Sequence, residues 1–303
     1  MFIKNQRTVK NKVSCFGIGL HSGSFVNMNI QPASVDAGIV FRRIDINGKA
    51  IGEIKAAYDL VSTTFLGTNL ISKDGLIKIA TVEHLMAALW GCGIDNAIVE
   101  IDSDELPIMD GSSDHFVFMI ECAGIIEQNV GRRFIEILKR VEVSDGSAKA
   151  FICPDNDFTV KMDISFNDSI IEDQSCSFVA NTSSFKVELS KARTFGFLKD
   201  VEKLKEIGLI KGGSLDNAIV VGNDKILNDN GLRFKDEFVR HKVLDSIGDL
   251  YLCGARIMGH FHGIKSGHSL NNQLLRTLFA DKSAWRAIQF NDKFDFSNDP
   301  VAS

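Results

Sequence analysis

"FVRHKVLDSIGDL", residues 238–250, is the stretch that decides both the fold and the candidate chemistry of this chain. Its apolar side chains recur at helical spacing, which predicts an amphipathic helix packed against a core. His241, Asp245 and Asp249 follow one another at four-residue intervals and therefore share one face of that helix. Taken alone, three polar residues on one helix face are more typical of a solvated helix surface than of half a metal site. Whether they bind a metal depends on which other ligands the chain provides.

The composition limits the classes of protein to which the chain can belong. The chain has 303 residues, 45% of them hydrophobic, which is enough to bury the core of one large domain or of two ordinary ones. A net charge of −5 argues against a nucleic-acid-binding surface. No apolar run reaches the roughly 18 residues of a membrane span, and the N-terminus lacks an apolar signal core. We expect a cytoplasmic protein without a transmembrane segment.

The cysteines and histidines restrict the kind of metal site. Six cysteines are scattered without a CxxC pair, so we expect reduced, buried thiols and neither disulfides nor a thiolate metal site. A metal would therefore need histidine and carboxylate ligands. Seven histidines are available: His21, His84, His115, His241, His260, His262 and His268.

The order of predicted elements indicates an α+β fold, because strands precede helices in both halves of the chain. The first half predicts strands at 25–31, 38–45 and 96–102 and helices at 81–93 and 115–125. The second half predicts strands at 133–143, 149–155 and 158–166 and helices at 200–208, 238–250 and 267–279. Apolar periodicity lapses at 125–133, where we place the boundary between two sheet-and-helix domains, residues 1–128 and 129–303.

A catalytic zinc site usually has three protein ligands, an open position for water and a carboxylate nearby. His241 and Asp245 supply two ligands at helical spacing. The third is best sought in "TVEHLMAAL", residues 81–89, where Glu83 and His84 are adjacent at the start of a helix. One side chain could bind metal while the other faces the water. Taken alone, such a pair is more often a glutamate in the capping region of a helix beside a core or surface histidine that binds no metal.

Two further histidine segments are candidates for chemistry. Gly267 should leave His268 exposed at a turn before a helix, which suits a proton donor, and Asp249 could favour its protonated form. A plain surface histidine fits the same local pattern. His260 and His262 would share one face of a strand, so they are a competing candidate pair of metal ligands.

Two other segments carry little general information. "LIKGGSLDN", residues 209–217, lacks the spacing of a phosphate-binding loop, so its glycines indicate a turn between a helix and a strand. In "KARTFGF", residues 191–197, Thr194 is typical of a packing or capping threonine.

The motifs together, in their order, resemble the UDP-3-O-acyl-N-acetylglucosamine deacetylases, which catalyse the committed step of lipid A synthesis in Gram-negative bacteria. The resemblance runs from about residue 2 to residue 280. Seven segments carry it: "GIGLHSG" (17–23), "TVEHLMAAL" (81–89), "ELPIMDGSS" (105–113), "KARTFGF" (191–197), "GGSLDNAIVV" (212–221), "GLRFKDEFVRHKVLDSIGDLYL" (231–252) and "KSGHSLNN" (265–272).

The resemblance implies a zinc amidohydrolase of two α+β domains, packed against each other with the active site between them. It implies that His84, His241 and Asp245 are the ligands of one zinc ion, for which iron(II) is a possible substitute. Glu83 matches the general base. His268, oriented by Asp249, matches the charged histidine that acts as general acid or electrostatic stabiliser.

The resemblance also implies how the substrate, a nucleotide-sugar lipid, is held. Thr194 and Lys242 match residues at the developing oxyanion. Phe195, with Leu209 and Gly213 in the segment 208–213, matches the wall of the acyl-chain passage, and Lys265 matches a cation near the diphosphate. Phe65 and Gly67, near the expected mouth, depart from the residues that other members often carry. We expect a monomer.

Two rival interpretations have distinct signatures. The first is another metal hydrolase built on His260 and His262. The second is a non-catalytic protein that binds the nucleotide sugar or the acyl chain and uses zinc structurally. A structural zinc normally has four protein ligands, so three ligands beside Glu83 favour catalysis.

Overall fold

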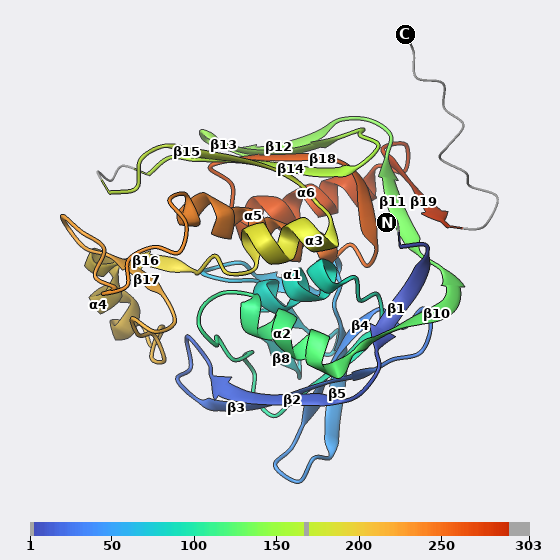
Figure 1. The fold of residues 1–303 in the computed structure, drawn as a ribbon, viewed down its shortest axis with the longest axis horizontal. Coiled ribbons are helices and arrows are strands. Elements are labelled where there is room, and N and C mark those ends of the chain that lie inside the picture. The colour runs from blue at the N-terminus through green and yellow to red at the C-terminus, as the bar shows by residue number, and fades with distance from the viewer. Residues whose placement is uncertain (1–2, 167–169, 291–303) are drawn as a thin grey trace.

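Two sheet-and-helix halves face each other through their helices in the computed structural model, which describes residues 3–166 and 170–290 (Figure 1). The outer layers are sheets and the helices lie between them, so the fold is α+β as predicted. In the first half a five-stranded sheet has the order β2-β3-β9-β4-β5. Its strands are β2 (Val13–Ile18), β3 (Phe25–Pro32), β4 (Ile39–Ile44), β5 (Ala50–Lys55) and β9 (Ala97–Ile101).

The helices α1 (Glu83–Cys92) and α2 (Asp114–Ala123) belong to this half. A 3-10 turn, η1 (Tyr58–Leu60), leads into a small antiparallel sheet, which lies next to the start of α1 in the chain. Its strands are β6 (Val61–Thr63), β7 (Asn69–Ile71) and β8 (Lys78–Ile79).

The second half is organised around β18 (Arg256–Ile264), the longest strand described. It pairs in parallel with β11 and β14 and antiparallel with β13 within a seven-stranded sheet. The helices α5 (Glu237–Tyr251) and α6 (His268–Ala280) pack beneath this sheet (Figure 1). The remaining strands are β11 (Arg133–Ile137), β12 (Val141–Asp145), β13 (Ala148–Cys153), β14 (Phe158–Ile164), β15 (Gln174–Val179) and β19 (Trp285–Gln289).

A separate unit projects from the second half, on the left of Figure 1. It consists of the parallel pair β16 (Phe195–Phe197) and β17 (Ile219–Val221), with α4 (Leu198–Glu206) between them in the chain. The short helix α3 (Thr182–Ser184) and the π-helix η2 (Phe185–Leu189) precede it.

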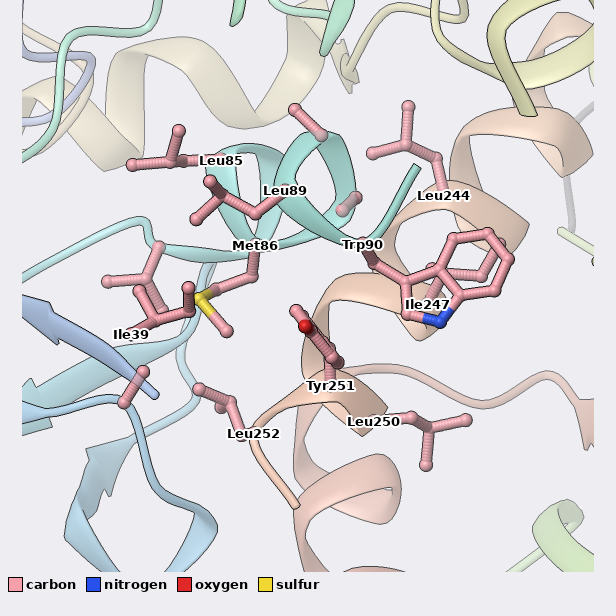
Figure 2. Close-up of a cluster of buried hydrophobic side chains, with 14 of the residues drawn as sticks. Ile39, Leu85, Met86, Leu89, Trp90, Leu244, Ile247, Leu250, Tyr251 and Leu252 are labelled. Carbon is pink, nitrogen blue, oxygen red and sulfur yellow. The ribbon is translucent and has the colours of Figure 1, made fainter. Parts of the chain in front are cut away.

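The core forms where α1 meets α5. Every residue of α1 is buried, and the apolar faces of the two helices supply Leu85, Leu89, Leu244 and Ile247 to one cluster (Figure 2). Gly93 ends α1 in the left-handed conformation, with φ +74°, which glycine adopts without strain.

Close approach of these two helices depends on one glycine. A Cβ atom at Gly248 of α5 would lie only 2.1 Å from the backbone oxygen of Glu83, the first residue of α1. The absence of a side chain therefore lets the start of α1 rest directly on α5. This contact sets the distance between the residues that the two helices carry.

Residues 125–133, where the sequence lacks apolar periodicity, are mostly β-strand. β10 (Ile125–Gly131) pairs antiparallel with β1 (Asn5–Val9) in a two-stranded ribbon. None of the side chains of β10 is fully buried, so no alternating apolar pattern is required there. The division into two domains at residue 128 stays a prediction, and its outer ends at 1–2 and 291–303 lie outside the described residues.

The structure corrects the expectation that the cysteine thiols are buried. All six are free, as predicted, but only Cys92 is buried, and Cys122 is exposed on α2. No helix in the described ranges is long and apolar enough to cross a bilayer.

Candidate active site

Three side chains from the facing helices converge on one point between the halves. His84 comes from the first turn of α1, and His241 and Asp245 come from successive turns of α5. Nε2 of His84 lies 3.5 Å from Oδ1 of Asp245, and Nε2 of His241 lies 3.3 Å from the same oxygen. Within residues 3–166 and 170–290 this is the group of histidine, cysteine and acidic side chains that could hold a metal ion.

The donors of this group fit a zinc ion. Oδ1 of Asp245 is buried and forms no hydrogen bond with any described residue, which leaves a lone pair directed at the two histidines. Nδ1 of His241 donates to the carbonyl oxygen of Ala192 over 3.0 Å, so its Nε2 is free for a metal. Burial lowers the pKa of His241 to about 3, which keeps the imidazole in the neutral form that binds metals.

Glu83 stands beside this group as a buried carboxylate. Its Oε2 accepts a hydrogen bond of 2.9 Å from the backbone N–H of Thr68. Burial is the largest cause of a raised pKa for Glu83. A Cβ at Gly67 would lie 3.1 Å from Oε1 of Glu83, so the glycine leaves room next to the free carboxylate oxygen. A carboxylate with a raised pKa near a metal group is suited to accept and return protons.

His268 is the partner of Asp249, as the sequence predicted. Its Nδ1 lies 2.8 Å from Oδ2 of Asp249, and its Nε2 lies 3.9 Å from Oε1 of Glu83. Burial alone would lower the pKa of His268, but the charge and hydrogen bond of Asp249 outweigh it and raise the pKa to about 9. His268 is therefore a cation at neutral pH.

The predicted exposure of His268 is wrong. Its side chain is only 12% exposed, because Asp249 draws the ring inward from the first position of α6. Both carboxylate oxygens of Asp249 are engaged by residues outside the metal group. It also accepts from Oγ1 of Thr68 over 2.6 Å and from Nδ2 of Asn271 over 2.9 Å.

Two cavities adjoin each other, and the first of them contains the metal group. The first, of about 410 Å³, is lined by the metal group, Glu83, His268, Lys242 and the exposed Lys265. Nζ of Lys242 also donates to Oδ2 of Asp245 over 2.9 Å. The second cavity, of about 400 Å³, is mainly apolar and is lined by residues of β16, α4 and β17. Both are lined by Leu20, Leu66, Thr194 and Phe195.

The apolar cavity is lined by only part of the segment 208–213. Gly213 and Ile210 line it, whereas Leu209 does not. Ile210 adopts φ +48°, in the left-handed region. Phe65 is 61% exposed, and the adjacent Leu66 reaches the cavities instead.

The competing histidine pair is engaged elsewhere. On β18, Nδ1 of His260 lies 2.7 Å from Oγ1 of Thr159, and Nε2 of His262 lies 2.5 Å from Oδ2 of Asp163. No third ligand joins them among the described residues. The rival metal site is therefore not formed.

Some residues that support the candidate site were not predicted from the sequence. Thr68 supports both Glu83 and Asp249, and nothing in its local sequence signals this role. Asn271 follows His268 at helical spacing, so it could have been found as a second donor to Asp249. Ser113, at the N-cap position of α2, donates its hydroxyl to the carbonyl oxygen of His84 over 2.8 Å and steadies the first turn of α1.

Comparisons with known proteins agree with this geometry. The model of a family described as "UDP-3-O-acyl N-acetylglycosamine deacetylase" matches residues 6–280. The chain is 50% identical over 290 residues to the UDP-3-O-acyl-N-acetylglucosamine deacetylase of Marinobacter nauticus, covering 95% of this chain and 94% of that protein. Proteins of the same name from Teredinibacter turnerae and Pseudomonas entomophila are 48% and 49% identical, each with 95% of this chain and 94% of the relative covered.

Proposed function

The chain belongs to the UDP-3-O-acyl-N-acetylglucosamine deacetylase family, and from this premise we propose how its residues divide the work of hydrolysing the acetamide. The enzyme is a zinc amidohydrolase of lipid A biosynthesis that acts on a nucleotide-sugar lipid. The reaction releases acetate and leaves a free amine on the sugar. The observation that carries the proposal is the buried group of His84, His241 and Asp245 with Glu83 beside it.

The two cavities suit the two parts of such a substrate. An acyl chain would occupy the apolar cavity behind Phe195, lined also by Ile210 and Gly213, where its burial is favourable by about 0.8 kcal/mol per methylene. The sugar acetamide would then lie in the cavity of the metal group. Lys265, at the rim of that cavity, is a suitable cation for the diphosphate.

Glu83 is proposed as the general base. A zinc ion held by His84, His241 and Asp245 supplies a Lewis acid, which activates water near neutral pH and polarises a carbonyl. Glu83 would take the proton of the attacking water on Oε1, since Oε2 is held by Thr68. Its raised pKa brings it closer to the pH at which it must both accept and release that proton.

Attack on the acetamide carbon places negative charge on the carbonyl oxygen. The hydroxyl of Thr194 and the ammonium of Lys242 line the cavity and would stabilise this oxyanion. The departing nitrogen then needs a proton, which His268 or Glu83 would give it. Asp249 keeps the ring of His268 oriented and charged for this step.

The direct test is acetate release from UDP-3-O-acyl-N-acetylglucosamine by purified protein that has been stripped of metal and then titrated with zinc. Activity should vanish on stripping and return as zinc approaches one ion per chain. A folded protein that releases no acetate at any zinc level would refute the proposal and reopen the non-catalytic interpretation.

A further inference from the structure

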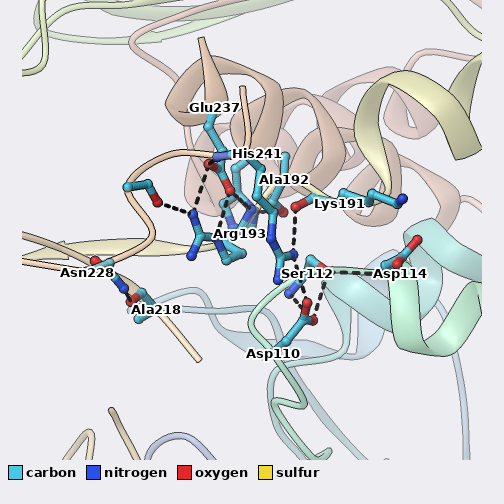
Figure 3. A network of polar contacts seen from close by, with 12 residues as sticks. Asp110, Ser112, Asp114, Lys191, Ala192, Arg193, Ala218, Asn228, Glu237 and His241 are labelled. Carbon is cyan, nitrogen blue, oxygen red and sulfur yellow. Dashed lines mark hydrogen bonds and ion pairs between the residues drawn. The ribbon is translucent and has the colours of Figure 1, made fainter. Parts of the chain in front are cut away.

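The peptide unit between Ala192 and Arg193 is clamped at both ends by one helix. Its carbonyl oxygen accepts the hydrogen bond of 3.0 Å from Nδ1 of His241. Its N–H donates to Oε1 of Glu237, also over 3.0 Å. Glu237 and His241 lie on successive turns of α5, so the two contacts reach the same peptide from neighbouring positions (Figure 3).

We propose that Glu237 is a positioning residue for the metal centre, acting on His241 through the peptide unit of Ala192 and Arg193. The proposal rests on the assignment of His241 as a zinc ligand. A histidine ligand commonly donates its second ring N–H to a fixed acceptor, which sets the tautomer and the direction of the ring. Here that acceptor is a loop carbonyl, and Glu237 is what holds the loop peptide in place.

Glu237 is itself held rigidly. It has no exposed surface, and its carboxylate accepts from Nε of Arg193 over 2.9 Å, from Nη2 of Arg193 over 3.2 Å and from the backbone N–H of Arg233 over 2.5 Å. The guanidinium of Arg193 neutralises the carboxylate. The main effect on His241 is therefore geometric, because little net charge remains to act across the peptide.

Further contacts fix the same segment of chain. Nη1 of Arg233 donates to the carbonyl oxygen of Lys191 over 3.0 Å and to Oδ2 of Asp110 over 2.8 Å. The N–H of Thr194 donates to the carbonyl oxygen of Gly111 over 2.8 Å. The anchored segment thus runs from Lys191 to Thr194, and it presents the Ala192 carbonyl to His241 and the side chain of Thr194 to the cavity.

The chain contains a matched control for this clamp. Oδ2 of Asp95 accepts from the backbone N–H of Arg7 over 2.8 Å and from Nη2 of the buried Arg132 over 2.7 Å. A carboxylate thus holds a backbone N–H and an arginine, as Glu237 does. No hydrogen bond or ion pair joins Asp95, Arg7 or Arg132 to the three residues of the metal group, so Asp95→Ala reports the cost of losing such a carboxylate alone.

The experiment measures the zinc dissociation constant of metal-free Glu237→Ala by competition with a chromophoric chelator. Alanine removes the acceptor of the Arg193 N–H, which a glutamine would keep. Misplacing a group that supports a metal ligand typically weakens binding about 10- to 100-fold, and we expect a rise in Kd of that size. Asp95→Ala should keep the wild-type Kd. The visible absorption of the cobalt(II)-loaded protein should change in Glu237→Ala, because the ring of His241 tilts, and not in Asp95→Ala.

A second variant keeps the test valid if Glu237→Ala fails to fold. Glu237→Ala leaves Arg193 buried without its partner, whereas Glu237→Ala combined with Arg193→Met removes both charges and is better tolerated. The double variant should show the same weakened zinc binding. Zinc affinity in Glu237→Ala or in the double variant equal to that of Asp95→Ala would overturn the inference. Unchanged zinc affinity in His241→Ala would overturn the ligand assignment itself.

Discussion

At the scale of single residues, the site is a set of side chains whose second hydrogen-bonding position is already occupied. Nδ1 of His241 and of His268 are engaged by Ala192 and Asp249, and Oε2 of Glu83 is engaged by Thr68. Only the reactive atom of each side chain remains free. The protein thereby fixes the direction in which each group can act before a substrate arrives.

Glu83→Gln tests the proposed base. The amide keeps the shape and can still accept from Thr68, but it cannot take a proton. We expect turnover to fall by about 10²- to 10⁴-fold while the zinc content stays near one ion per chain. Acetate release and zinc content should be measured on the same preparation. Turnover close to that of the wild type would remove Glu83 from the role of base.

His268 should make stability depend on pH in a defined window. Because its pKa is raised from 6.5 to about 9, its charged form contributes stability that is complete below about pH 6.5 and is lost as the pH rises through about 9. In metal-free protein, the difference in unfolding free energy between wild type and His268→Gln should shrink by about 3 kcal/mol between about pH 6 and pH 10. Denaturant titrations across this range measure it. A constant difference would contradict the charged state assigned to His268.

At the scale of elements, the contact between α1 and α5 controls the spacing of the metal ligands. Gly248→Ala would push a methyl group against the backbone of Glu83 and separate His84 from His241 and Asp245. We expect a stability loss of about 1 to 3 kcal/mol and weaker zinc binding.

Gly91→Ala is the control for this prediction. A Cβ there would lie 2.1 Å from the ring of Phe185, at the other end of α1. It should also lose stability, but it should keep its zinc affinity. Equal zinc affinity in the two variants would show that the close contact at Gly248 does not set the ligand spacing.

The unit of β16, α4 and β17 should determine how much acyl chain fits. Ala218 lines the apolar cavity next to β17, so Ala218→Phe would fill part of it. Each excluded methylene costs about 0.8 kcal/mol, which is about fourfold in kcat/KM. The loss should be large for long acyl chains and small for short ones. An equal loss for both chain lengths would place the acyl group elsewhere.

The sequence predicted some elements far better than others. β14 was predicted because its buried side chains alternate, and α1 and α5 were predicted because apolar residues recur through them at helical spacing. The pairing of β1 with β10 could not be predicted, because side chains of a half-exposed ribbon carry no such period. Ile210 could not be predicted to line the apolar cavity, because it lies in an irregular segment, with φ +48°, that has no periodic pattern.

The candidate site was predictable only in part, because only some of its residues follow a spacing that can be seen in a sequence. His241, Asp245 and Asp249 share a helix face, and helical spacing is visible in a sequence. The adjacency of α1 to α5 is not visible there, so His84 was a candidate because it follows Glu83 at a helix start, and the resemblance of the motifs was needed to name it as the third ligand. Backbone partners such as the carbonyl of Ala192 carry no sequence signal, since every residue has one.

At the scale of the whole molecule, metal binding and folding should be coupled, because the ligands come from both halves. A ligand that binds only the folded state at about 100 times its Kd stabilises it by about 2.7 kcal/mol. Chelation should therefore lower the Tm of the wild type, and zinc should restore it. His84→Ala should show a Tm that does not respond to zinc. A wild-type Tm that is insensitive to chelator would contradict a shared site.

The division of the metal group between α1 and α5 has a consequence for synthesis on the ribosome. His84 leaves the ribosome early, whereas His241 and Asp245 leave it only after most of the second half has been translated. A nascent chain that stops before residue 241 carries one ligand, and one that stops between residues 241 and 244 carries two, so neither can assemble the complete group. The three ligands are therefore present together only after Asp245 has been translated.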